Sequence, residues 1–423
     1  MSSNPLINFG ALRDIVAEKT DVQVKTIDLI GKDEVCKIYH ILLENNTILV
    51  AKVAVSGAMS PIFESEVATI NYIKAGTSLP VPTIIAFDTS STNGVGPYII
   101  TEKIIGVNLE SMFSKLTPFQ RHAVVAQIAE WMIELSHHRF EAIGGLVCQD
   151  STYYVGPATG AAFFVDGRAN LPLDRGPFTT ARAYYQACAQ RELDCSRVFL
   201  SQDTSLEYQR HLEDSRVQVE RSVSLMLELI SRCPDLDEDP PSPAPFGIDL
   251  HSVKLKDLFV TAENPSRIIC VDGWQGVATG PLWRCARLPR WLRPSISDEH
   301  IQEQSASSFI FKQKVQEMEG SDSSFLRALD NEDTRHALDD ISGYDAFKDG
   351  FLLLPTLESM LATLPGEEDV DGLSAMLDPA TLVGRVARIN LVTRGSNAMF
   401  LAMPGGRGTM NRSEPGTPPI ISV

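Results

Sequence analysis

The alternation of apolar and polar residues in the first quarter of the chain predicts an antiparallel β-sheet. Short runs rich in β-branched residues are separated by polar turns, for example at residues 31–34 and 44–46. Runs joined by such turns are typical of β-hairpins. The strands are expected at 22–30, 36–43, 47–55, 83–87 and 98–101.

Apolar residues at helical spacing predict one helix within this region and several after it. Phe63, Val67, Ile70 and Ile73 lie three or four residues apart, so residues 63–75 are expected to form a helix with one buried stripe. Further helices are predicted at 118–137, 181–198, 207–232, in a charged region up to about residue 340, and at 346–353 and 356–364 with Pro355 between them, whereas 144–175 reads as a long loop.

The stretch 246–283 carries the most informative polar residues. It reads as a loop with Asp249, a short strand at 258–260, a turn, and a second strand at 268–271 that ends in Asp272. Phosphoryl transfer from ATP needs two such carboxylates, because one orients the attacking hydroxyl and the other holds magnesium. On these residues alone, a surface hairpin with two solvated aspartates is the simpler interpretation.

Two charged residues in the predicted sheet and helix have a similar double interpretation. Lys52 lies inside a predicted strand with apolar residues on both sides. It is either a lysine on the solvent face or a cation that points into a cleft and pairs with phosphate oxygens. Glu66 lies in the first turns of the helix at 63–75, where the helix dipole favours acidic residues. Alternatively, its position lets it reach back and fix Lys52.

The composition limits the class of protein. Of 423 residues, 43% are hydrophobic and 22% are charged, which is ordinary for a soluble globular protein with room for two lobes. The net charge is −17 and there is no run rich in Lys and Arg, so nucleic acid is not expected as the main partner. Seven scattered cysteines without a CxxC pair argue against a zinc site and fit a reducing compartment.

The same features bear on localisation. No apolar run is long enough to cross a membrane, so no membrane span is expected. The first twenty residues lack the apolar core of a secretory signal, and Asp14 and Glu18 are unlike a mitochondrial presequence. The sequence therefore predicts a cytoplasmic protein.

With these elements in place, the chain resembles the aminoglycoside phosphotransferase and choline-kinase-like superfamily. It is most similar to the fungal branch that includes the altered-inheritance-of-mitochondria phosphotransferases. The segments that carry the resemblance keep the family's order across roughly residues 25–290. They are Leu49-Val-Ala-Lys-Val-Ala, Ser65-Glu-Val-Ala-Thr-Ile, Leu79-Pro-Val-Pro, Tyr98-Ile-Ile-Thr-Glu-Lys-Ile-Ile-Gly, Tyr154-Val-Gly-Pro-Ala-Thr, Leu173-Asp-Arg-Gly-Pro-Phe, Asp249-Leu-His with Lys256-Asp-Leu-Phe-Val, and Trp274-Gln-Gly-Val with Gly280-Pro-Leu-Trp.

The resemblance implies an α+β fold of the protein-kinase-like, bilobal type. After an N-terminal segment (1–21), an N-lobe of antiparallel sheet and one helix (22–103) would bind the nucleotide. A mainly helical C-lobe (104–365) would carry the catalytic and metal loops (246–283). The remaining residues, 366–423, would form an extension that is disordered at its end.

The same resemblance implies a nucleotide site between the two lobes, with ATP and Mg²⁺ as the cofactors. Gly31 would belong to the phosphate loop. Lys52 would contact the α and β phosphates, and Glu66 would hold this lysine in place. The backbone from Glu102 to Ile104 would meet the adenine.

Catalysis would then fall to the C-lobe. By position in the family motif, Asp249 would be the catalytic base. Asp257 would stand where the family has a magnesium-binding asparagine, and Asp272 would be the main magnesium ligand. Positioning and electrostatic stabilisation supply most of the catalysis in this chemistry.

Several catalytic segments depart from the family's pattern. The histidine expected two residues before Asp249 is Gly247, and Asp257 aligns only if residues 252–254 are treated as an insertion. An ungapped alignment places Gly273, not Asp272, on the metal aspartate. A shift of one residue in a strand turns the side chain to the opposite face.

A further departure lies in the phosphate loop, where Lys32, Asp33 and Glu34 replace the expected small residues. Either catalysis is relaxed or lost, or an error in the gene structure inserted residues 252–254.

These observations leave two functional hypotheses. The first is a kinase that uses ATP and magnesium to phosphorylate a hydroxyl group of a small-molecule acceptor, which the sequence does not identify. The acidic residues at 235–239 would suit a cationic acceptor. The second is a pseudokinase that binds a nucleotide or a protein partner without turnover. Because related proteins are mitochondrial, mitochondria are the alternative location.

Overall fold

The protein is described here from a computed structural model. The structure describes residues 7–199, 206–233, 235–237, 243–293, 301–330, 334–346 and 348–363. The predicted C-terminal extension at 366–423 lies outside these residues.

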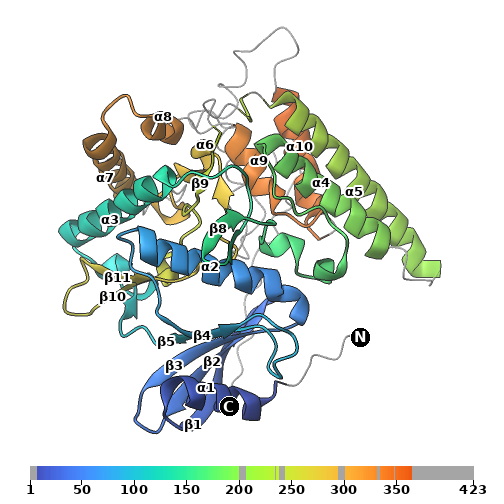
Figure 1. Ribbon diagram of the computed structural model, residues 1–423. Coiled ribbons are helices and arrows are strands. Elements are labelled where there is room, and N and C mark those ends of the chain that lie inside the picture. The colour runs from blue at the N-terminus through green and yellow to red at the C-terminus, as the bar shows by residue number, and fades with distance from the viewer. Residues whose placement is uncertain are drawn as a thin grey trace, which may run out of the picture.

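A five-stranded antiparallel sheet forms one end of the molecule (Figure 1). The strand order is β1-β2-β3-β5-β4, so β1 and β4 are the edges. Polar turns follow β1 and β2, which explains why each strand pairs with its neighbour in the chain. The strands are β1 (Val24–Lys32), β2 (Cys36–Leu43), β3 (Ile48–Ala54), β4 (Ile84–Asp88) and β5 (Tyr98–Glu102).

Two helices cover opposite faces of this sheet. Helix α1 (Phe9–Thr20) buries Leu12 and Val16 against one face, together with Tyr39, Ala51 and Ile100 from the strands. Helix α2 (Ser60–Gly76) packs on the other face. Because side chains alternate along a strand, the residue after Ala51 in β3 points towards the side of α2.

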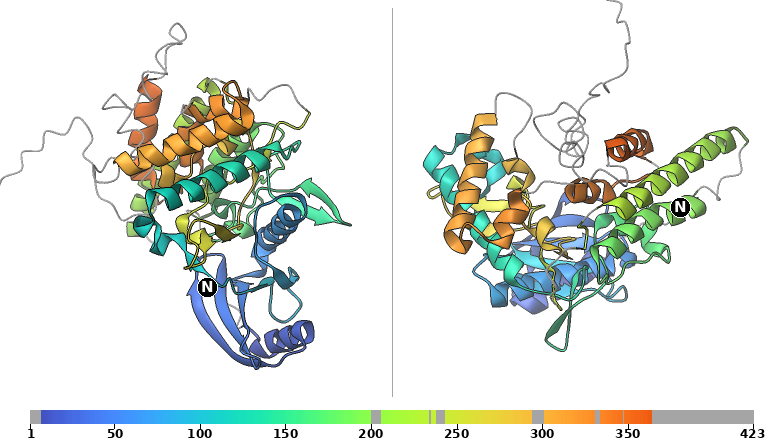
Figure 2. Two further views of the ribbon diagram at one scale, coloured as in Figure 1. Left: turned by 90° about the vertical axis from the view of Figure 1, so that its left-hand side faces the viewer. Right: turned by 90° about the horizontal axis from the view of Figure 1, so that it is seen from above.

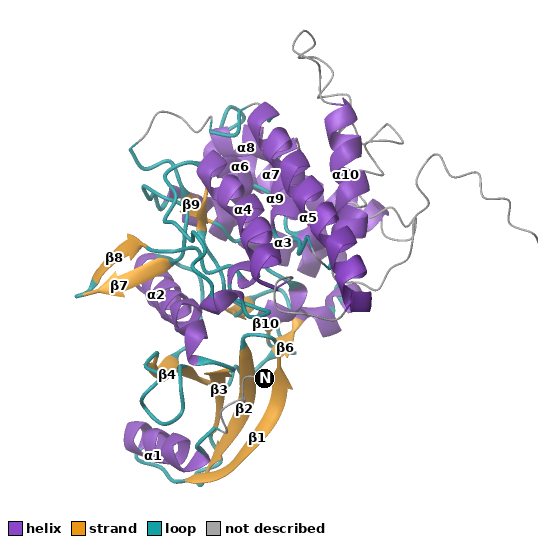
Figure 3. Ribbon diagram, turned by 90° about the vertical axis from the view of Figure 1, so that its right-hand side faces the viewer, coloured by secondary structure: helices purple, strands orange, loops and turns teal. Residues whose placement is uncertain are grey.

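The second half of the molecule is mainly helical and lies above the sheet in Figure 3. Helix α3 (Pro118–His137) begins at a capping box of Thr117 and Gln120 and packs against α7 (Ile301–Glu319). Helices α4 (Ala181–Phe199) and α5 (Leu206–Arg232) run side by side, and the right panel of Figure 2 shows them at the edge of the molecule. The shorter helices are α6 (Leu282–Cys285), α8 (Ser324–Asp330), α9 (Thr334–Ser342) and α10 (Gly350–Thr363).

Short strands connect the two halves. The predicted hairpin of β10 (Leu258–Val260) and β11 (Ile268–Val271) is present, and β6 (Val107–Asn108) extends it to three strands. Strand β9 (Gly247–Ile248) pairs with β12 (Thr279–Gly280). The prediction of an antiparallel N-lobe and a mainly helical C-lobe is therefore confirmed.

Three details of the sequence prediction were wrong or incomplete. The N-terminal segment contains helix α1, which packs on the sheet. The predicted loop at 144–175 includes a hairpin of β7 (Leu146–Gln149) and β8 (Thr152–Val155). Pro355 was expected to break or kink the run between two helical segments, but helix α10 continues through it.

Packing explains the continuity of α10. Proline costs the helix a hydrogen bond to the carbonyl four residues earlier. Leu353, Leu357 and Met360 nevertheless form one buried stripe in the same core as Val223 and Met226 of α5. Their burial outweighs the lost hydrogen bond.

No helix in the described residues is long and apolar enough to span a membrane.

Candidate active site

The two charged residues of the N-lobe that the sequence singled out form an ion pair. The Nζ atom of Lys52 in β3 lies 2.6 Å from Oε1 of Glu66 in α2, whose side chain is only 1% exposed. The same Nζ atom lies 3.6 Å from Oδ1 of Asp272, which directly follows β11. Burial alone would lower the pKa of Lys52, but the two carboxylates outweigh it and hold this pKa above its ordinary value. The lysine is therefore a fixed cation.

One oxygen of this cluster has no partner. Oε2 of Glu66 is buried and makes no hydrogen bond to any described residue. A buried, unsatisfied carboxylate oxygen is costly unless another group binds it. The cluster therefore leaves an acceptor available next to Lys52.

The hinge segment after β5 has an unused backbone donor. The amide of Glu102 donates to the carbonyl of Thr83 at 3.1 Å, and that of Lys103 donates to Ile48 at 3.2 Å. The amide of Ile104 has no partner among the described residues. A free amide at this place fits the backbone contact with adenine that the family resemblance implies.

Asp249 lies at the end of β9 and is held on both carboxylate oxygens. Oδ1 accepts from the backbone amide of His251 at 2.9 Å and lies 2.6 Å from Nδ1 of the same residue. Oδ2 lies 2.9 Å from Nε of Arg284. Burial alone would raise the pKa of Asp249, but His251 and Arg284 outweigh it and lower this pKa. With 4% of its side chain exposed, Asp249 is a buried, ionised carboxylate.

A chain of charged residues continues from Asp249 into the C-lobe. Nε of Arg284 lies 3.3 Å from Oδ1 of Asp339, which also accepts a hydrogen bond from the hydroxyl of Tyr185. Burial opposes ionisation of Asp339, but Arg284 and other cations around it lower its pKa to about 2. Sequence reasoning missed Arg284, His251 and Asp339 as partners of Asp249. The pairing of β9 with β12 places α6, and thus Arg284, beside the aspartate.

The absence of the family's histidine has a steric reason. A Cβ atom at Gly247 would lie 3.1 Å from Cα and 3.2 Å from the carbonyl oxygen of Ser136 in α3. A larger side chain would require β9 and α3 to separate. His251 and Arg284 hold Asp249 instead, from the other side of the loop.

The three extra residues before Asp257 are packed into the fold. Val253 is buried, and its carbonyl accepts a hydrogen bond from Nε1 of Trp291 at 3.2 Å. The amide of Lys254 donates to the Asp257 carboxylate at 3.1 Å.

The two predicted magnesium ligands lie next to each other. The amide of Asp272 donates to the carbonyl of Asp257 at 2.7 Å. Burial raises the pKa of Asp257, and the charge of Asp272 adds to this rise. Gly273 has a φ of 85°, and a Cβ atom there would lie 2.8 Å from Cγ of Asp257. Because Oδ1 of Asp272 lies 3.6 Å from Nζ of Lys52, the structure places Asp272, and not Gly273, beside this lysine.

These carboxylates fit a magnesium ion. Among the described residues, no group of three or more His, Cys, Asp or Glu side chains is placed to hold a metal alone. Mg²⁺ does not need such a group, because it usually binds one or two carboxylates together with water and substrate phosphates. Asp257 and Asp272 would hold it, and when bound it would neutralise charge on the phosphates.

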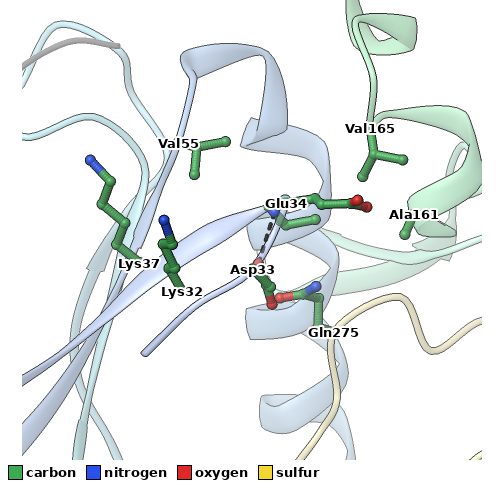
Figure 4. A pocket seen from close by; sticks show the side chains of 9 residues that line it. Lys32, Asp33, Glu34, Lys37, Val55, Ala161, Val165 and Gln275 are labelled. Atoms are coloured by element: carbon green, nitrogen blue, oxygen red, sulfur yellow. Dashed lines mark hydrogen bonds between the residues drawn. The ribbon is translucent and has the colours of Figure 1, made fainter. Parts of the chain in front are cut away.

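The phosphate loop turns one of its acids onto its own backbone. Gly31, which pairs with Ile38 next to an irregularity in the ladder, leads into this loop. Oδ1 of Asp33 accepts from the amides of Val35 at 2.8 Å and Cys36 at 2.7 Å. This engagement within the turn (Figure 4) would reduce the repulsion between the Asp33 carboxylate and a bound triphosphate.

A segment of the C-lobe faces this loop and is fixed by one arginine. The guanidinium of Arg175 donates to the carbonyls of Phe163 at 3.0 Å and Arg168 at 2.8 Å, and to two carbonyls nearby. It also lies over the ring of Phe164. These contacts give the segment a defined shape where it meets the N-lobe.

Comparisons with known proteins identify relatives of part of the chain. No family model matches it. It is 29% identical over 157 residues to a subtelomeric hrmA-associated cluster protein of Aspergillus fumigatus, which covers 33% of this chain and 30% of that protein. It is 28% identical over 153 residues to altered inheritance of mitochondria protein 9, mitochondrial, of Candida tropicalis, which covers 33% of this chain and 25% of that protein. The matches thus span less than a third of the relatives' own length.

The solved structures that the chain resembles include aminoglycoside phosphotransferases. One is a ternary complex of aminoglycoside phosphotransferase APH(4)-Ia with ADP and hygromycin B, with 14% identity, a TM-score of 0.43 and coverage of 91% of this chain and 100% of that one. Another is the APH(2'')-IIa complex with streptomycin and ATP, with 10% identity, a TM-score of 0.45 and coverage of 88% and 97%. The sequence similarity to the altered-inheritance-of-mitochondria protein confirms, over about a third of the chain, the resemblance that the motifs indicated.

Proposed function

We propose that the protein is a kinase-like phosphotransferase that uses ATP and Mg²⁺ to phosphorylate a hydroxyl group of a small molecule. The observation that carries this proposal is the ion pair of Lys52 and Glu66 at 2.6 Å, with Asp272 3.6 Å from the same ammonium group. A strand lysine fixed by a helix glutamate, next to a carboxylate after a β-hairpin, is what phosphate positioning in kinases requires.

Each residue then has a role in the transfer. Lys52 contacts the α and β phosphates, and the free amide of Ile104 contacts adenine. The acceptor oxygen attacks the γ phosphorus, the bond from this phosphorus to the oxygen that bridges it to the β phosphate breaks, and ADP leaves. The hydroxyl proton passes to Asp249. Asp257 and Asp272 would hold the magnesium ion, which would neutralise charge on the phosphates.

The acceptor is a small molecule of unknown identity. The hypothesis of a cationic acceptor rested on the acidic residues at 235–239. Of these, Asp237 forms an ion pair with Arg182 at 3.1 Å, so this carboxylate already has a structural partner. Residues 238 and 239 lie outside the described part of the chain.

A second function, nucleotide binding without turnover, is favoured by the environment of Asp249. A general base needs one oxygen within reach of the hydroxyl whose proton it accepts. Both oxygens of Asp249 are engaged, by His251 and Arg284, and 4% of the side chain is exposed. Turnover therefore requires that the acceptor hydroxyl reach an Asp249 oxygen that already lies against His251 or Arg284. A pseudokinase would keep Asp249 paired with Arg284 and would act through a protein partner.

Thermal denaturation with ATP, with and without Mg²⁺, tests the nucleotide site. A ligand at a hundred times its dissociation constant stabilises a protein by about 2.7 kcal/mol. We expect a rise in Tm that needs both ATP and Mg²⁺ and is lost in Lys52→Met. The control Lys25→Met, an exposed lysine on β1, should keep it. Absence of any nucleotide effect on the wild-type protein would overturn the proposal.

Release of ADP in the presence of candidate acceptors separates the two functions. An enzyme should lose turnover in Asp249→Asn while keeping its ATP-dependent rise in Tm. If the wild-type protein binds ATP but transfers no phosphate to any acceptor, the pseudokinase is favoured.

The cellular location also remains a proposal. We propose the cytosol, with mitochondria as the alternative, because one matched relative carries "mitochondrial" in its name. Imaging of a C-terminally tagged chain in a fungal cell distinguishes the two.

A further inference from the structure

Arg284 in α6 lies against two carboxylates but gives neither of them a hydrogen bond. Its Nε atom is 2.9 Å from Oδ2 of Asp249 and 3.3 Å from Oδ1 of Asp339. The N–H of this Nε atom is nevertheless not directed at either oxygen well enough for a hydrogen bond. The two terminal nitrogens of the guanidinium donate to no described residue either. The N–H donors of Arg284 are therefore unused within the part of the chain that the structure describes.

The neighbouring arginine of the same cluster behaves differently. Arg287 donates to Oδ2 of Asp339 at 3.3 Å and to Oδ2 of Asp340. Its side chain is 4% exposed, whereas that of Arg284 is 16% exposed. Buried donors without an acceptor are costly unless another group binds them. The unused donors of Arg284, beside the predicted catalytic base, therefore point to a ligand that offers an acceptor oxygen at this place.

The charges around Arg284 limit what this ligand can be. Burial alone would lower the pKa of Arg284, but Asp339 and Asp249 outweigh it and hold this pKa well above its ordinary value. Since two carboxylates already balance the guanidinium, the place does not favour an anion. An uncharged hydroxyl group fits better, because its oxygen accepts a hydrogen bond from an N–H group while its own hydrogen is donated to a carboxylate.

We propose that Arg284 is a catalytic residue that holds the attacking hydroxyl group of the acceptor against Asp249. The hydroxyl oxygen accepts a hydrogen bond from the guanidinium, and its hydrogen is donated to Oδ2 of Asp249. During transfer this oxygen bonds to the γ phosphorus, the bond from the phosphorus to the β–γ bridging oxygen breaks, and the proton passes to Asp249. Arg284 keeps its protons throughout. This inference rests on the proposed function and adds that the reacting group of the acceptor is an uncharged hydroxyl.

A glycine gives the stem of this arginine its place. A Cβ atom at Gly280, at the end of β12, would lie 3.1 Å from Cδ of Arg284. The arginine stem would have to give way to it. Gly280→Ala therefore offers a way to displace the guanidinium without removing its charge.

Release of ADP, with water and with a panel of neutral sugars and polyols as acceptors, tests the role of Arg284. Arg284→Lys keeps a cation between the carboxylates but loses the planar fork of N–H donors. We expect its kcat to fall at least about tenfold, with an unchanged rise in Tm on adding ATP and Mg²⁺. The matched control, Arg287→Lys, changes a buried arginine beside the same Asp339 and should keep the wild-type kcat. Gly280→Ala should lower kcat in the same direction as Arg284→Lys.

The outcomes separate this inference from the proposed function. Equal kcat values for Arg284→Lys and Arg287→Lys would overturn the inference, while turnover that still depends on Lys52 would leave the proposed function intact. Loss of the ATP effect on Tm in Arg284→Lys would also overturn it, because the arginine would then serve the nucleotide. If Arg284→Lys does not fold, an unchanged kcat in Gly280→Ala decides against the inference. A wild-type protein that releases no ADP with any acceptor would contradict the proposed function and the inference together.

Discussion

Nε of Arg284 lies 2.9 Å from Oδ2 of Asp249, inside the C-lobe, and only 3.3 Å from a second carboxylate, that of Asp339. The guanidinium of Arg284 lies between these two carboxylates, and Arg287 also approaches Asp339 at 3.3 Å. Unpaired charges at such depth are strongly destabilising, whereas paired ones are tolerated. Arg284 is thus the cation that the two carboxylates share, and its loss would weaken the pairing of both.

Replacement of this arginine by methionine should destabilise the protein strongly. Arg284→Met keeps part of the apolar stem but leaves Asp249 and Asp339 without their shared cation. We expect a loss of about 3–5 kcal/mol in the free energy of unfolding, measured by urea denaturation at pH 7. The double variant with Asp249→Asn should recover part of this loss, because it removes one of the two buried charges that lost Arg284 as a partner.

The surface pair of Lys312 and Asp330, at 2.6 Å, provides the control. Both side chains are close to half exposed, so Lys312→Met should cost less than about 1 kcal/mol. If Arg284→Met cost no more than this control, the cluster around Asp249 would not be the buried, mutually dependent unit described above.

Gly247 is expected to tolerate no side chain. Because its Cβ would lie 3.1 Å from the backbone of Ser136, Gly247→Ala should lower the free energy of unfolding by about 1–3 kcal/mol, and Gly247→His by more. The control is Gly160→Ala, where no atom lies within 4 Å of the added Cβ. Differential scanning calorimetry should show a lower Tm for Gly247→Ala than for the wild-type protein, and an unchanged Tm for Gly160→Ala. An increase in stability on Gly247→His would mean that the family's histidine can be restored.

The sequence was sufficient to predict the elements that local patterns encode. Strands 36–43, 258–260 and 268–271 were predicted with the bounds that the structure gives, because each is an apolar run between turn residues. Helix α3 was predicted equally well, since a proline and a capping box mark its start. The contact of Lys52 with Glu66 was predicted because strand alternation and helix position both limit where these side chains can point.

Features that depend on tertiary packing were not accessible to the same reasoning. Arg284, Asp249 and Asp339 are far apart in the sequence, and no periodicity relates them. The continuity of α10 through Pro355 depends on its packing against α5. The roles of the predicted site residues in binding and catalysis stay predictions, because contacts between side chains do not by themselves establish turnover.

The buried histidine of α9 predicts how stability depends on pH. Nε2 of His336 donates to the carbonyl of Trp283 at 2.8 Å, and burial, together with the charge of Arg287, lowers the pKa of His336 well below its ordinary value of 6.5. As the pH falls through about 6.5, the unfolded chain takes up a proton that the folded chain does not, so stability falls. We expect a loss of about 1 kcal/mol between pH 7 and pH 5.5.

Urea denaturation across this range checks the sign and the residue. His336→Gln can still donate to the carbonyl of Trp283, but it has no titrating ring, so the dependence on pH should become flatter. His122→Gln, at an exposed position of α3, is the matched control and should keep the wild-type slope. A wild-type slope in His336→Gln would assign the pH dependence to other groups.

Asp257 predicts a conflict between stability and metal binding. The pKa of its carboxyl is raised because burial disfavours the charge and Asp272 repels it. A raised carboxyl pKa means that ionisation weakens the folded state above the pKa of the unfolded chain, which includes neutral pH. Asp257→Asn removes the charge, and its amide oxygen can still accept from the amide of Lys254. We therefore expect a higher free energy of unfolding at pH 7 and about tenfold more Mg²⁺ for half-maximal ATP binding.

The control variant Glu263→Gln, in the turn of the same hairpin, should change neither the free energy of unfolding nor the Mg²⁺ requirement. Lower stability with an unchanged magnesium requirement would show that Asp257 is held in place for a structural reason and that Asp272 alone would have to hold the metal.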